Sequence, residues 1–426
     1  MSRQCQLARD TRTGSVFAGG GGQQDLKGCR AKTACRETPV YSTVPRHLYI
    51  HVPFCARRCS YCDFSIAVRA ATPVDEYLLA LRTEADRVVQ PSWTLDTVYL
   101  GGGTPSRLGG EGIARLLSAI RERTQMNPGA ELTLEANPDD VTPEAAGAWF
   151  NAGVNRVSLG AQSFDDRVLD WMHRVHTADQ TRRAVHCLRG AGIENISLDL
   201  IFNLPAHLGR SWESDVSQVI DLEPTHISLY GLTVEHQTPI ARWADRGAIV
   251  EGTESQYADE FLYAHEATAA AGFDHYEVSN FARPGRASRH NSAYWTRAPY
   301  AALGPSAHSF DGDFRRWNVP AYADWAGRLQ RGETVIGGEE ELSPANRDAE
   351  RVYLGLRTKA GVLLTESEVA AAELWIGKGW AELSGTRLTL TPAGWLRLDG
   401  LAATLAAGRD KRVIPPRSTT PSRCYI

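Results

Sequence analysis

At 426 residues the chain is long enough for one large domain and a smaller one, and its 42% of hydrophobic residues is ordinary for a globular protein. The formal net charge of −4 provides no overall attraction for nucleic acid or for an anionic membrane surface. No apolar run approaches the ~18 residues of a membrane-spanning helix, and Met1–Ala18 lacks the apolar segment of a secretory signal. We therefore expect a cytoplasmic protein with no membrane span and no nucleic-acid partner.

Residues 1–44 are rich in Gly, Arg, Gln and Thr and show no hydrophobic period, so we predict a disordered extension. Residues 408–426 form a second tail of this kind. Between the tails, strands alternate with helices. Six short β-branched and apolar runs predict strands at His47–Val52, Thr97–Leu100, Glu131–Leu134, Arg156–Leu159, Asn195–Leu200 and His226–Tyr230. Helical patterns follow most of them, at Val74–Val89, Ile113–Arg123, Pro143–Asn151, Thr177–Arg189 and Ser255–Ala271.

This alternation is typical of right-handed βαβ units around a parallel sheet. Six units predict an α/β fold, a partial (β/α)6 barrel of the TIM type, over residues 45–285. In such folds the site forms at the carboxyl ends of the strands, and nearly every end here is polar or glycine-rich. The ends carry Cys55, Gly101–Gly102–Gly103–Thr104, Glu135, Gln162, Asp199 with Asn203–Leu204–Pro205, and Gly231–Leu232–Thr233. We therefore expect one large site at this edge.

Two regions follow the barrel. Residues 286–341 are predicted to be a connecting segment with an irregular, aromatic-rich stretch from Arg289 to Trp317. Residues 342–407 predict a small winged-helix-like domain, with helices at Asn346–Arg357 and Thr365–Leu374, a hairpin at Ala381–Leu390 and a last helix at Pro392–Leu401. Its seven Lys and Arg against seven Asp and Glu disfavour DNA binding. We expect this domain to be structural or to bind a partner.

The eight cysteines are too few for a disulfide framework, but Cys55, Cys59 and Cys62 lie close together with CxxxCxxC spacing. Three thiolates on one short loop can hold three irons of a [4Fe–4S] cluster and leave the fourth iron without a protein ligand. The amino and carboxylate groups of S-adenosylmethionine (SAM) can bind that open iron. A structural zinc site is the alternative. Zinc needs four closed ligands, and only His51 lies near enough in sequence to be the fourth.

The glycine run after the second strand leaves its backbone bare, so that a ligand such as the SAM ammonium can approach closely. Taken alone, the run also fits a tight turn. Glu135 at the next strand end can pair with the same ammonium or with the ribose hydroxyls, although a carboxylate at such an edge is more often simply solvated.

The motifs taken together resemble those of the HemN/HemW group of radical SAM proteins. They are YIHVPFCxxxCxYCDF, GGGTPS, LEANPDD, LGAQSFDD, SLDLIFNLP and HNxxYW, and they cover His47–Ala407. The resemblance implies a radical SAM core, a HemN-type C-terminal domain and chemistry that belongs to the cofactor. It also implies SAM contacts at Tyr49, Tyr61, Gly102, Gly103, Thr104, Glu135, Gln162, Arg174 and Asp199. In the HemN type, some of these positions serve a second SAM molecule.

Two positions depart from the coproporphyrinogen-oxidising members of the group. Those members carry a fourth cysteine two residues beyond the triplet, where this chain has Phe64. Their usual Tyr–Gly–Leu–Pro after the fifth strand is here Phe202–Asn203–Leu204–Pro205, a change expected to alter the substrate pocket. Members with Phe at the Phe64 position and the HNxxYW motif resemble HemW, described as a haem chaperone.

The HNxxYW motif stands at His290–Trp295. Chemistry alone favours a hydrogen-bonded histidine in an aromatic core, whereas the resemblance makes His290 the expected haem ligand. The leading hypothesis is a HemW-like haem chaperone with a [4Fe–4S] cluster, SAM and haem, whose partners are an electron donor and a haem-acceptor protein. One alternative is an oxygen-independent coproporphyrinogen III dehydrogenase, which converts two propionates to vinyls. A HemN-like methyltransferase is the other. The sequence leaves open whether the protein is catalytic.

Overall fold

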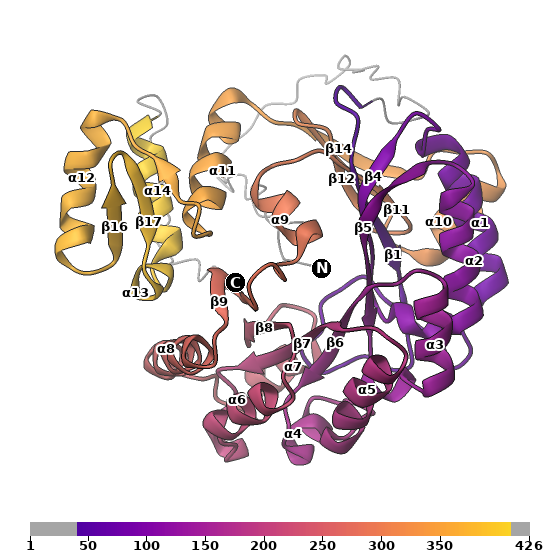
Figure 1. The fold of residues 1–426 in the computed structure, drawn as a ribbon, viewed down its shortest axis with the longest axis horizontal. Helices are drawn as coiled ribbons and strands as arrows, with labels where there is room; N and C mark the ends of the chain where they lie inside the picture. Colours follow the sequence, from indigo (N-terminus) through magenta and orange to yellow (C-terminus); the bar gives the residue numbers. More distant parts are fainter. Residues whose placement is uncertain (1–40, 410–426) are drawn as a thin grey trace, which may run out of the picture.

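The computed structural model of the chain describes residues 41–409 (Figure 1). The tails predicted at 1–44 and 408–426 fall outside this range except for residues 41–44 and 408–409. Tyr41 packs edge-on against the Trp93 ring with 5.3 Å between centroids. The Ser42 hydroxyl donates to the Asp311 carbonyl at 3.0 Å. Residues 41 and 42 therefore contact the folded core rather than belonging to an extension.

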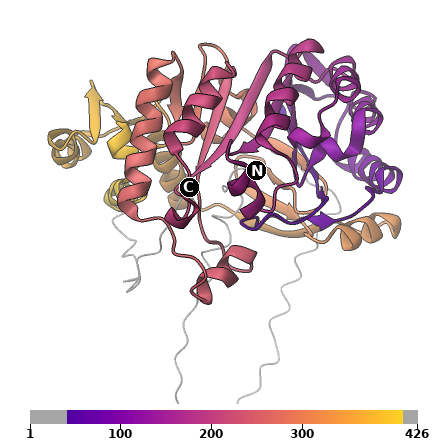
Figure 2. The same ribbon diagram turned by 90° about the horizontal axis from the view of Figure 1, so that it is seen from below.

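The six predicted strands are confirmed and form the parallel centre of a twelve-stranded sheet. They are β1 (His47–Val52), β4 (Thr94–Gly102), β5 (Gln125–Ala136), β6 (Arg156–Gln162), β7 (Asn195–Phe202) and β8 (His226–Gly231). Each pairs in parallel with the next in this order. The sheet curves into an arc with helices along its outer side, as a partial barrel does (Figures 1 and 2).

Eight helices connect or follow these strands: α1 (Val74–Val88), α2 (Gly109–Arg121), α3 (Pro143–Asn151), α4 (Asp166–Trp171), α5 (Ala178–Gly190), α6 (Trp212–Asp221), α7 (Pro239–Asp245) and α8 (Glu254–Ala270). Three of these helices begin and end in the same way. A threonine side chain caps the start of α3, α5 and α8. Each of the three ends in Ala–Gly–apolar, with Gly153, Gly192 and Gly272 at φ of 92°, 95° and 84°. The amide after each glycine bonds back to the last helical turn, which completes a Schellman motif.

The strands of the barrel alternate apolar and polar side chains. Leu48, Ile50 and Val52 of β1 are buried in the large core between sheet and helices, whereas Tyr49 forms a separate cluster with Tyr99. Parallel strands covered on both sides usually read as continuous apolar runs, so this alternation marks a polar interior. The register places these side chains on the inner face: Tyr49, His51, Tyr99, Thr133, Glu135, Arg156, Ser158, Ser197, Asp199, His226 and Ser228.

The prediction of an irregular stretch at Arg289–Trp317 is wrong. This region contains the helix α9 (Arg289–Trp295) and three strands, β11 (Tyr300–Leu303), β12 (His308–Phe310) and β13 (Phe314–Asn318). A fourth strand, β14 (Ile336–Glu341), follows and extends the same sheet. β11 pairs in parallel with β1, and the other three add on antiparallel. At the opposite edge, β10 (Asn280–Ala282) and β9 (Asp274–Glu277) follow β8. α10 (Tyr322–Gln330) packs beside α1.

A buried carboxyl on α1 holds this extension to the barrel. Glu84 accepts hydrogen bonds from the Gly304 amide at 2.8 Å, the Asn318 side chain at 2.6 Å and the Trp325 indole at 3.1 Å. Strands of three to six residues are too short to show a clear alternation in sequence. They form because such tertiary contacts hold them in place.

The C-terminal residues form a small domain around a three-stranded antiparallel sheet, with its hairpin where the sequence predicts it. Its elements are α11 (Pro344–Leu356), β15 (Val362–Leu363), α12 (Glu366–Gly377), β16 (Ala381–Ser384), β17 (Arg387–Leu390), α13 (Pro392–Trp395) and α14 (Leu398–Arg409). The single helix predicted at Pro392–Leu401 is instead two. The break follows Trp395, whose indole donates to the Leu356 carbonyl at 3.0 Å.

Two glycines at the end of α5 provide a matched test of the helix-stop signal. Gly192→Ala is expected to lower the free energy of unfolding by about 1–2 kcal/mol, because alanine is strained at positive φ. The added Cβ would also lie 3.0 Å from the Phe150 ring. Gly190→Ala, on the exposed last turn with open space around it, is expected to raise the same free energy by about 0.5–1 kcal/mol. Urea unfolding measures both changes in free energy, and equal changes would contradict the view that Gly192 ends the helix through its positive φ.

Candidate functional site

The cysteine triplet lies on a loop that leaves the carboxyl end of β1. Two short parallel strands, β2 (Phe54–Cys55) and β3 (Ala67–Val68), tie the two ends of this loop together. The Ser60 amide donates to the Met172 carbonyl after α4, and the Ser60 carbonyl accepts from the Ile240 amide of α7. The loop is therefore fixed at its base and at its middle, beside the ends of several strands.

All three cysteines are half-buried free thiols. Burial raises the pKa of Cys62 to about 12 and also raises that of Cys55. Cys55 lies 3.4 Å from the Thr104 hydroxyl, and the Arg174 guanidinium donates to Cys59 at 3.5 Å. Without metal the loop holds Cys55 and Cys62 as neutral thiols, so metal binding there would have to displace their protons.

The glycine run at the end of β4 is dictated by close packing. A Cβ at Gly102 would lie 2.6 Å from the His51 ring, and one at Gly103 would lie 2.6 Å from the Pro53 carbonyl group. The Gly103 amide donates to the Val52 carbonyl at 2.8 Å. The glycines therefore allow β4 to lie directly against β1 and the base of the cysteine loop.

Glu135 joins the glycine run to the polar interior. One carboxyl oxygen accepts from the Gly102 amide at 2.9 Å, and the other accepts from the Tyr99 hydroxyl at 2.8 Å. On the same inner face, Asp199 accepts from the hydroxyl of Ser158 at 3.1 Å, and burial raises the pKa of Asp199. Both carboxyls face the barrel interior, as the sequence predicted for strand ends.

Arg174 connects the cysteine loop with the ends of β5 and β6. Besides Cys59, its guanidinium donates to the Asn137 side chain at 2.7 Å and to the Gly160 carbonyl at 2.9 Å. Gly160 has no room for a side chain, because a Cβ there would lie 2.9 Å from the Gln162 amide group and 3.2 Å from Arg174. The structure thus brings Gln162 and Arg174 together. Sequence reasoning missed Asn137, although the motif LEANPDD contained it.

Two further residues predicted to contact SAM lie near this group. Tyr61 packs against the small apolar cluster of Val168, Met172, Ile201 and Leu204. Tyr49 lies one layer deeper, where its hydroxyl is 3.1 Å from His51 Nδ1. The predicted residues therefore surround the cysteine loop and line the interior beneath it.

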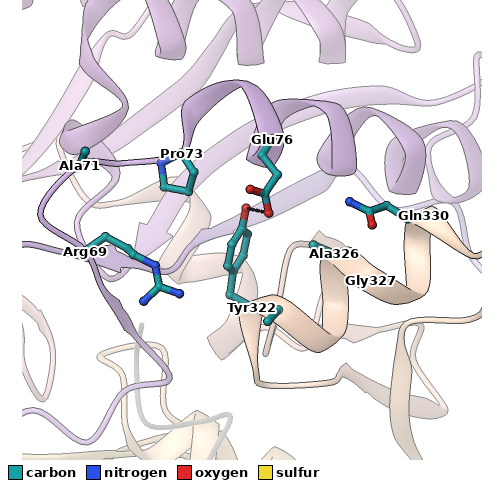
Figure 3. A pocket seen from close by; sticks show the side chains of 9 residues that line it. Arg69, Ala71, Pro73, Glu76, Tyr322, Ala326, Gly327 and Gln330 are labelled. Atoms are coloured by element: carbon teal, nitrogen blue, oxygen red, sulfur yellow. Dashed lines mark hydrogen bonds between the residues drawn. The ribbon is translucent and has the colours of Figure 1, made fainter.

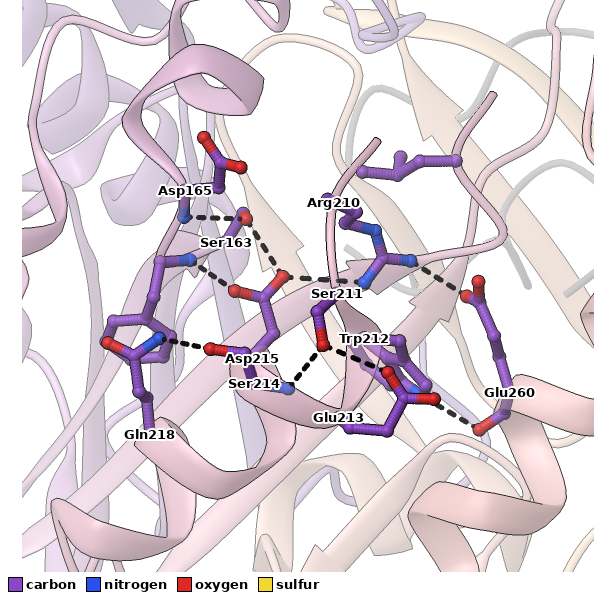
Figure 4. Close-up of polar contacts among 12 residues, drawn as sticks. Ser163, Asp165, Arg210, Ser211, Trp212, Glu213, Ser214, Asp215, Gln218 and Glu260 are labelled. Carbon is purple, nitrogen blue, oxygen red and sulfur yellow. Dashed lines mark hydrogen bonds and ion pairs between the residues drawn. The ribbon is translucent and has the colours of Figure 1, made fainter. Parts of the chain in front are cut away.

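A buried ionic network fixes the loops after β6 and β7 (Figure 4). Asp215 accepts from the Ser163 hydroxyl at 2.9 Å and from the Phe164 amide at 2.7 Å. Arg210 lies between Asp215, at 3.4 Å, and Glu260, at 2.8 Å. Its side chain is only 5% exposed, so removing either partner would leave a buried charge uncompensated. Sequence reasoning missed this network, because its members are distant in the chain.

Phe202 and Asn203, which replace the Tyr–Gly of coproporphyrinogen-oxidising relatives, make their contacts outside the barrel interior. The Phe202 ring packs against Tyr257 of α8 at 4.7 Å and against Trp212 of α6 at 5.9 Å. Asn203 takes the left-handed conformation with φ of 57°, which glycine would adopt easily, and its amide donates to Glu260 at 2.7 Å. Phe202 therefore packs among the helices outside the sheet, and an effect of this change on the substrate pocket stays a prediction.

His290 lies at the other end of the barrel interior, on α9 at the concave side of the sheet (Figure 1). Its Nδ1 is 2.6 Å from the Thr97 hydroxyl and its Nε2 is 2.9 Å from the Tyr294 hydroxyl. The His290 amide donates to Glu131, and the ring stacks on Tyr99 with 5.0 Å between centroids. The side chain is 1% exposed, and burial lowers its pKa, so the ring is neutral. Haem ligation by His290 stays a prediction that would require one of these hydrogen bonds to break.

His51, the fourth ligand that a zinc site would need, is fully engaged. Its Nδ1 faces Tyr49, and its Nε2 lies 3.1 Å from the Ser65 carbonyl. Burial lowers its pKa to about 4. Within residues 41–409, no three His, Cys, Asp or Glu side chains gather closely enough to hold a single metal ion.

The donor set fits a cluster with SAM. Three thiols on one loop are the ligands that such clusters take. Arg174 Nε is buried without a hydrogen-bond partner beside Cys59, and a ligand carboxylate would satisfy it. Glu135 and the surrounding hydroxyls provide acceptors for an ammonium or for ribose.

These features define the class of protein. The model of the radical SAM superfamily matches residues 49–216, which begin in β1 and end in α6. A solved structure of coproporphyrinogen III oxidase (HemN) from Escherichia coli, a radical SAM enzyme, superimposes with a TM-score of 0.72 at 20% identity. The alignment covers 88% of this chain and 92% of that one. The fold is that of a radical SAM protein.

Curated relatives narrow the family. Heme chaperone HemW of Mycobacterium tuberculosis is 37% identical over 85% of this chain and 95% of its own length. HemW of Lactococcus lactis is 36% identical over 76% of this chain and 84% of its own length, and HemW of Bacillus subtilis is 35% identical over 74% and 84%. The chain belongs to the HemW family.

Cys59 and Cys187 give a matched test of the ligand assignment. Cys59→Ala is expected to abolish most of the iron, the sulfide and the charge-transfer absorbance of anaerobically reconstituted protein, because one of three thiolates is lost. Cys187→Ala, on α5, is expected to leave all three unchanged. A full cluster in the Cys59 variant would contradict the assignment.

Proposed function

We propose that this protein is a cytoplasmic haem chaperone, which binds haem and transfers it to an acceptor protein. The observation that carries the proposal is the match to HemW chaperones over most of both chains. Phe64 supports it, because the fourth cysteine of coproporphyrinogen-oxidising relatives is absent at that position. No described helix is long and apolar enough to cross a membrane.

Cys55, Cys59 and Cys62 would hold a [4Fe–4S] cluster, and Glu135, Gln162 and Arg174 would hold SAM beside it. When bound, this pair supplies one-electron chemistry. The chain's own residues supply position: Arg174 ties Cys59 to the ends of β5 and β6, while Glu135 fixes the Gly102 amide. Tyr49, Tyr61, Gly103, Thr104 and Asp199 would provide the remaining contacts.

For haem we propose the HNxxYW end of the barrel, with His290 as the ligand. Tyr294 and Tyr300 lie close by, with 4.7 Å between their rings, and aromatic rings of this kind pack well on a macrocycle. Because Tyr294 occupies Nε2 of His290, haem binding is coupled to the release of that hydrogen bond.

Two substitutions distinguish a haem ligand, His290, from a residue that only hydrogen-bonds to it, Tyr294. His290→Ala is expected to shift the Soret band of bound haem and to weaken its binding at least about tenfold, because an axial ligand is lost. Tyr294→Phe frees Nε2 and is expected to keep the ligand signature. Anaerobic haem titration measures both. An unchanged titration with His290→Ala would eliminate His290 as the ligand.

The dehydrogenase alternative predicts a different product. Reconstituted protein incubated anaerobically with coproporphyrinogen III, SAM and a low-potential reductant is expected to leave the porphyrin mass unchanged. Catalytic loss of two formic-acid equivalents would establish a dehydrogenase and overturn the chaperone proposal. A gain of methyl groups would indicate the methyltransferase instead.

A further inference from the structure

The outer side of the cysteine loop carries a cluster of arginines. Arg57 and Arg58 stand between Cys55 and Cys59 and are exposed, as is Arg69 directly after β3. Arg107, on the turn after the glycine run, is half-buried beside them. Four cations surround one loop in a chain whose net charge is −4. We refer to these four residues as the arginine face.

Main-chain contacts show that the arginine face is one continuous surface. The Arg69 amide donates to the Cys55 carbonyl at 3.0 Å, and the Arg107 guanidinium donates to the Arg69 carbonyl at 3.2 Å. Arg58 donates to the Cys62 carbonyl at 3.0 Å. The arginines therefore lie one backbone layer from the cysteine thiols.

The arginines of the face form no ion pair with a carboxylate of the described residues, although Arg107 interacts electrostatically with Asp140. Other surface arginines pair with carboxylates, as Arg115 does with Asp75 at 2.7 Å and Arg123 with Asp86 at 2.6 Å. Among the ion pairs within the described part of the chain, none involves an arginine of the face. Exposed guanidinium groups that donate only to carbonyl oxygens keep their full charge and are available to a negatively charged surface.

The same face also carries one exposed apolar side chain and a hollow. Val68 of β3 is 43% exposed. Next to it, a hollow of about 310 Å³ opens between the start of α1 and α10, and Arg69, Pro73, Tyr322 and Gln330 are among its walls (Figure 3). The carboxylate in its lining, Glu76, accepts a hydrogen bond from Tyr322 at 2.9 Å. Arginine is enriched at protein–protein interfaces, and the hollow beside it can receive a side chain of a partner.

We propose that the arginine face is the docking site of a small acidic protein that carries single electrons and reduces the cluster. The inference rests on the proposed function, because it requires a cluster on the cysteine loop. In the step, the reduced carrier loses one electron and the oxidised cluster gains it, with no bond made or broken in this chain. Opposite charges accelerate the encounter of the two proteins, and the hollow accepts a side chain of the carrier.

Charge reversal tests the docking site. The variant Arg57→Glu with Arg69→Glu changes two exposed side chains that bond to neither a cysteine nor a carboxylate. The matched control is Arg183→Glu with Arg351→Glu, two exposed arginines on α5 and α11 whose side chains are 64% and 62% exposed. Both double variants have the same net charge. The probe is flavodoxin, a small acidic flavoprotein.

Binding is measured first, on protein without cluster. Wild-type and control proteins are expected to bind oxidised flavodoxin with an affinity that falls as salt is added, and the Arg57/Arg69 variant is expected to bind at least about tenfold more weakly at low salt. Equal binding by all three proteins, or absence of binding by the wild type, would overturn the docking site whether or not a cluster can be assembled.

Cluster reduction is measured second, on reconstituted protein. Reduced flavodoxin is expected to reduce the variant's cluster about tenfold or more slowly than the wild type's, whereas photoreduced 5-deazariboflavin, a small uncharged reductant, reduces both at the same rate. Equal rates with flavodoxin would overturn the proposal. Absence of a cluster in the wild type would instead refute the proposed function. The binding measurement, which needs no cluster, would still show whether the arginine face is the docking site.

Discussion

The cysteine loop can lie against β4 only because three consecutive glycines leave it room. A Cβ at Gly103 would lie 2.6 Å from the Pro53 carbonyl group, and one at Gly102 would lie as close to the His51 ring. The same contact allows Glu135 to reach the Gly102 amide, and so connects the loop with the interior of the barrel. The cysteines, the carboxyl and the inner face of the sheet are therefore placed by one packing constraint, and a side chain at these glycines would separate them.

The barrel interior is polar along its length, and its two ends differ in character. One end carries the three half-buried thiols and Arg174, whose Nε is buried without a hydrogen-bond partner. The other end carries His290, which is nearly inaccessible and has both ring nitrogens engaged. At the cysteine end, the buried network of Arg210 with Asp215 and Glu260 holds the loops that follow β6 and β7. Arg174 Nε can therefore take up a ligand without losing a hydrogen bond, whereas ligation at His290 requires one to break.

Regular features of the sequence predicted most of the barrel. Strict alternation along strands such as His47–Val52, and helices with a threonine cap and an Ala–Gly stop, are local signals that packing did not override. The added strands β11–β14 were not predictable, since they are short and depend on distant partners such as Glu84. The spacing of the cysteines predicted the kind of site, and the motifs supplied its other members. The hydrogen bonds of His290 and the Asn137 contact with Arg174 depend on three-dimensional proximity, which sequence spacing does not reveal.

Three cysteine ligands are expected to leave one iron of a [4Fe–4S] cluster open for SAM. Mössbauer spectroscopy of protein reconstituted anaerobically with iron-57, recorded before and after the addition of SAM, tests this open iron directly. We expect one iron of the four to change its spectrum when SAM binds, while the three thiolate-bound irons keep theirs. Spectra that are identical with and without SAM, from a fully assembled cluster, would contradict the claim.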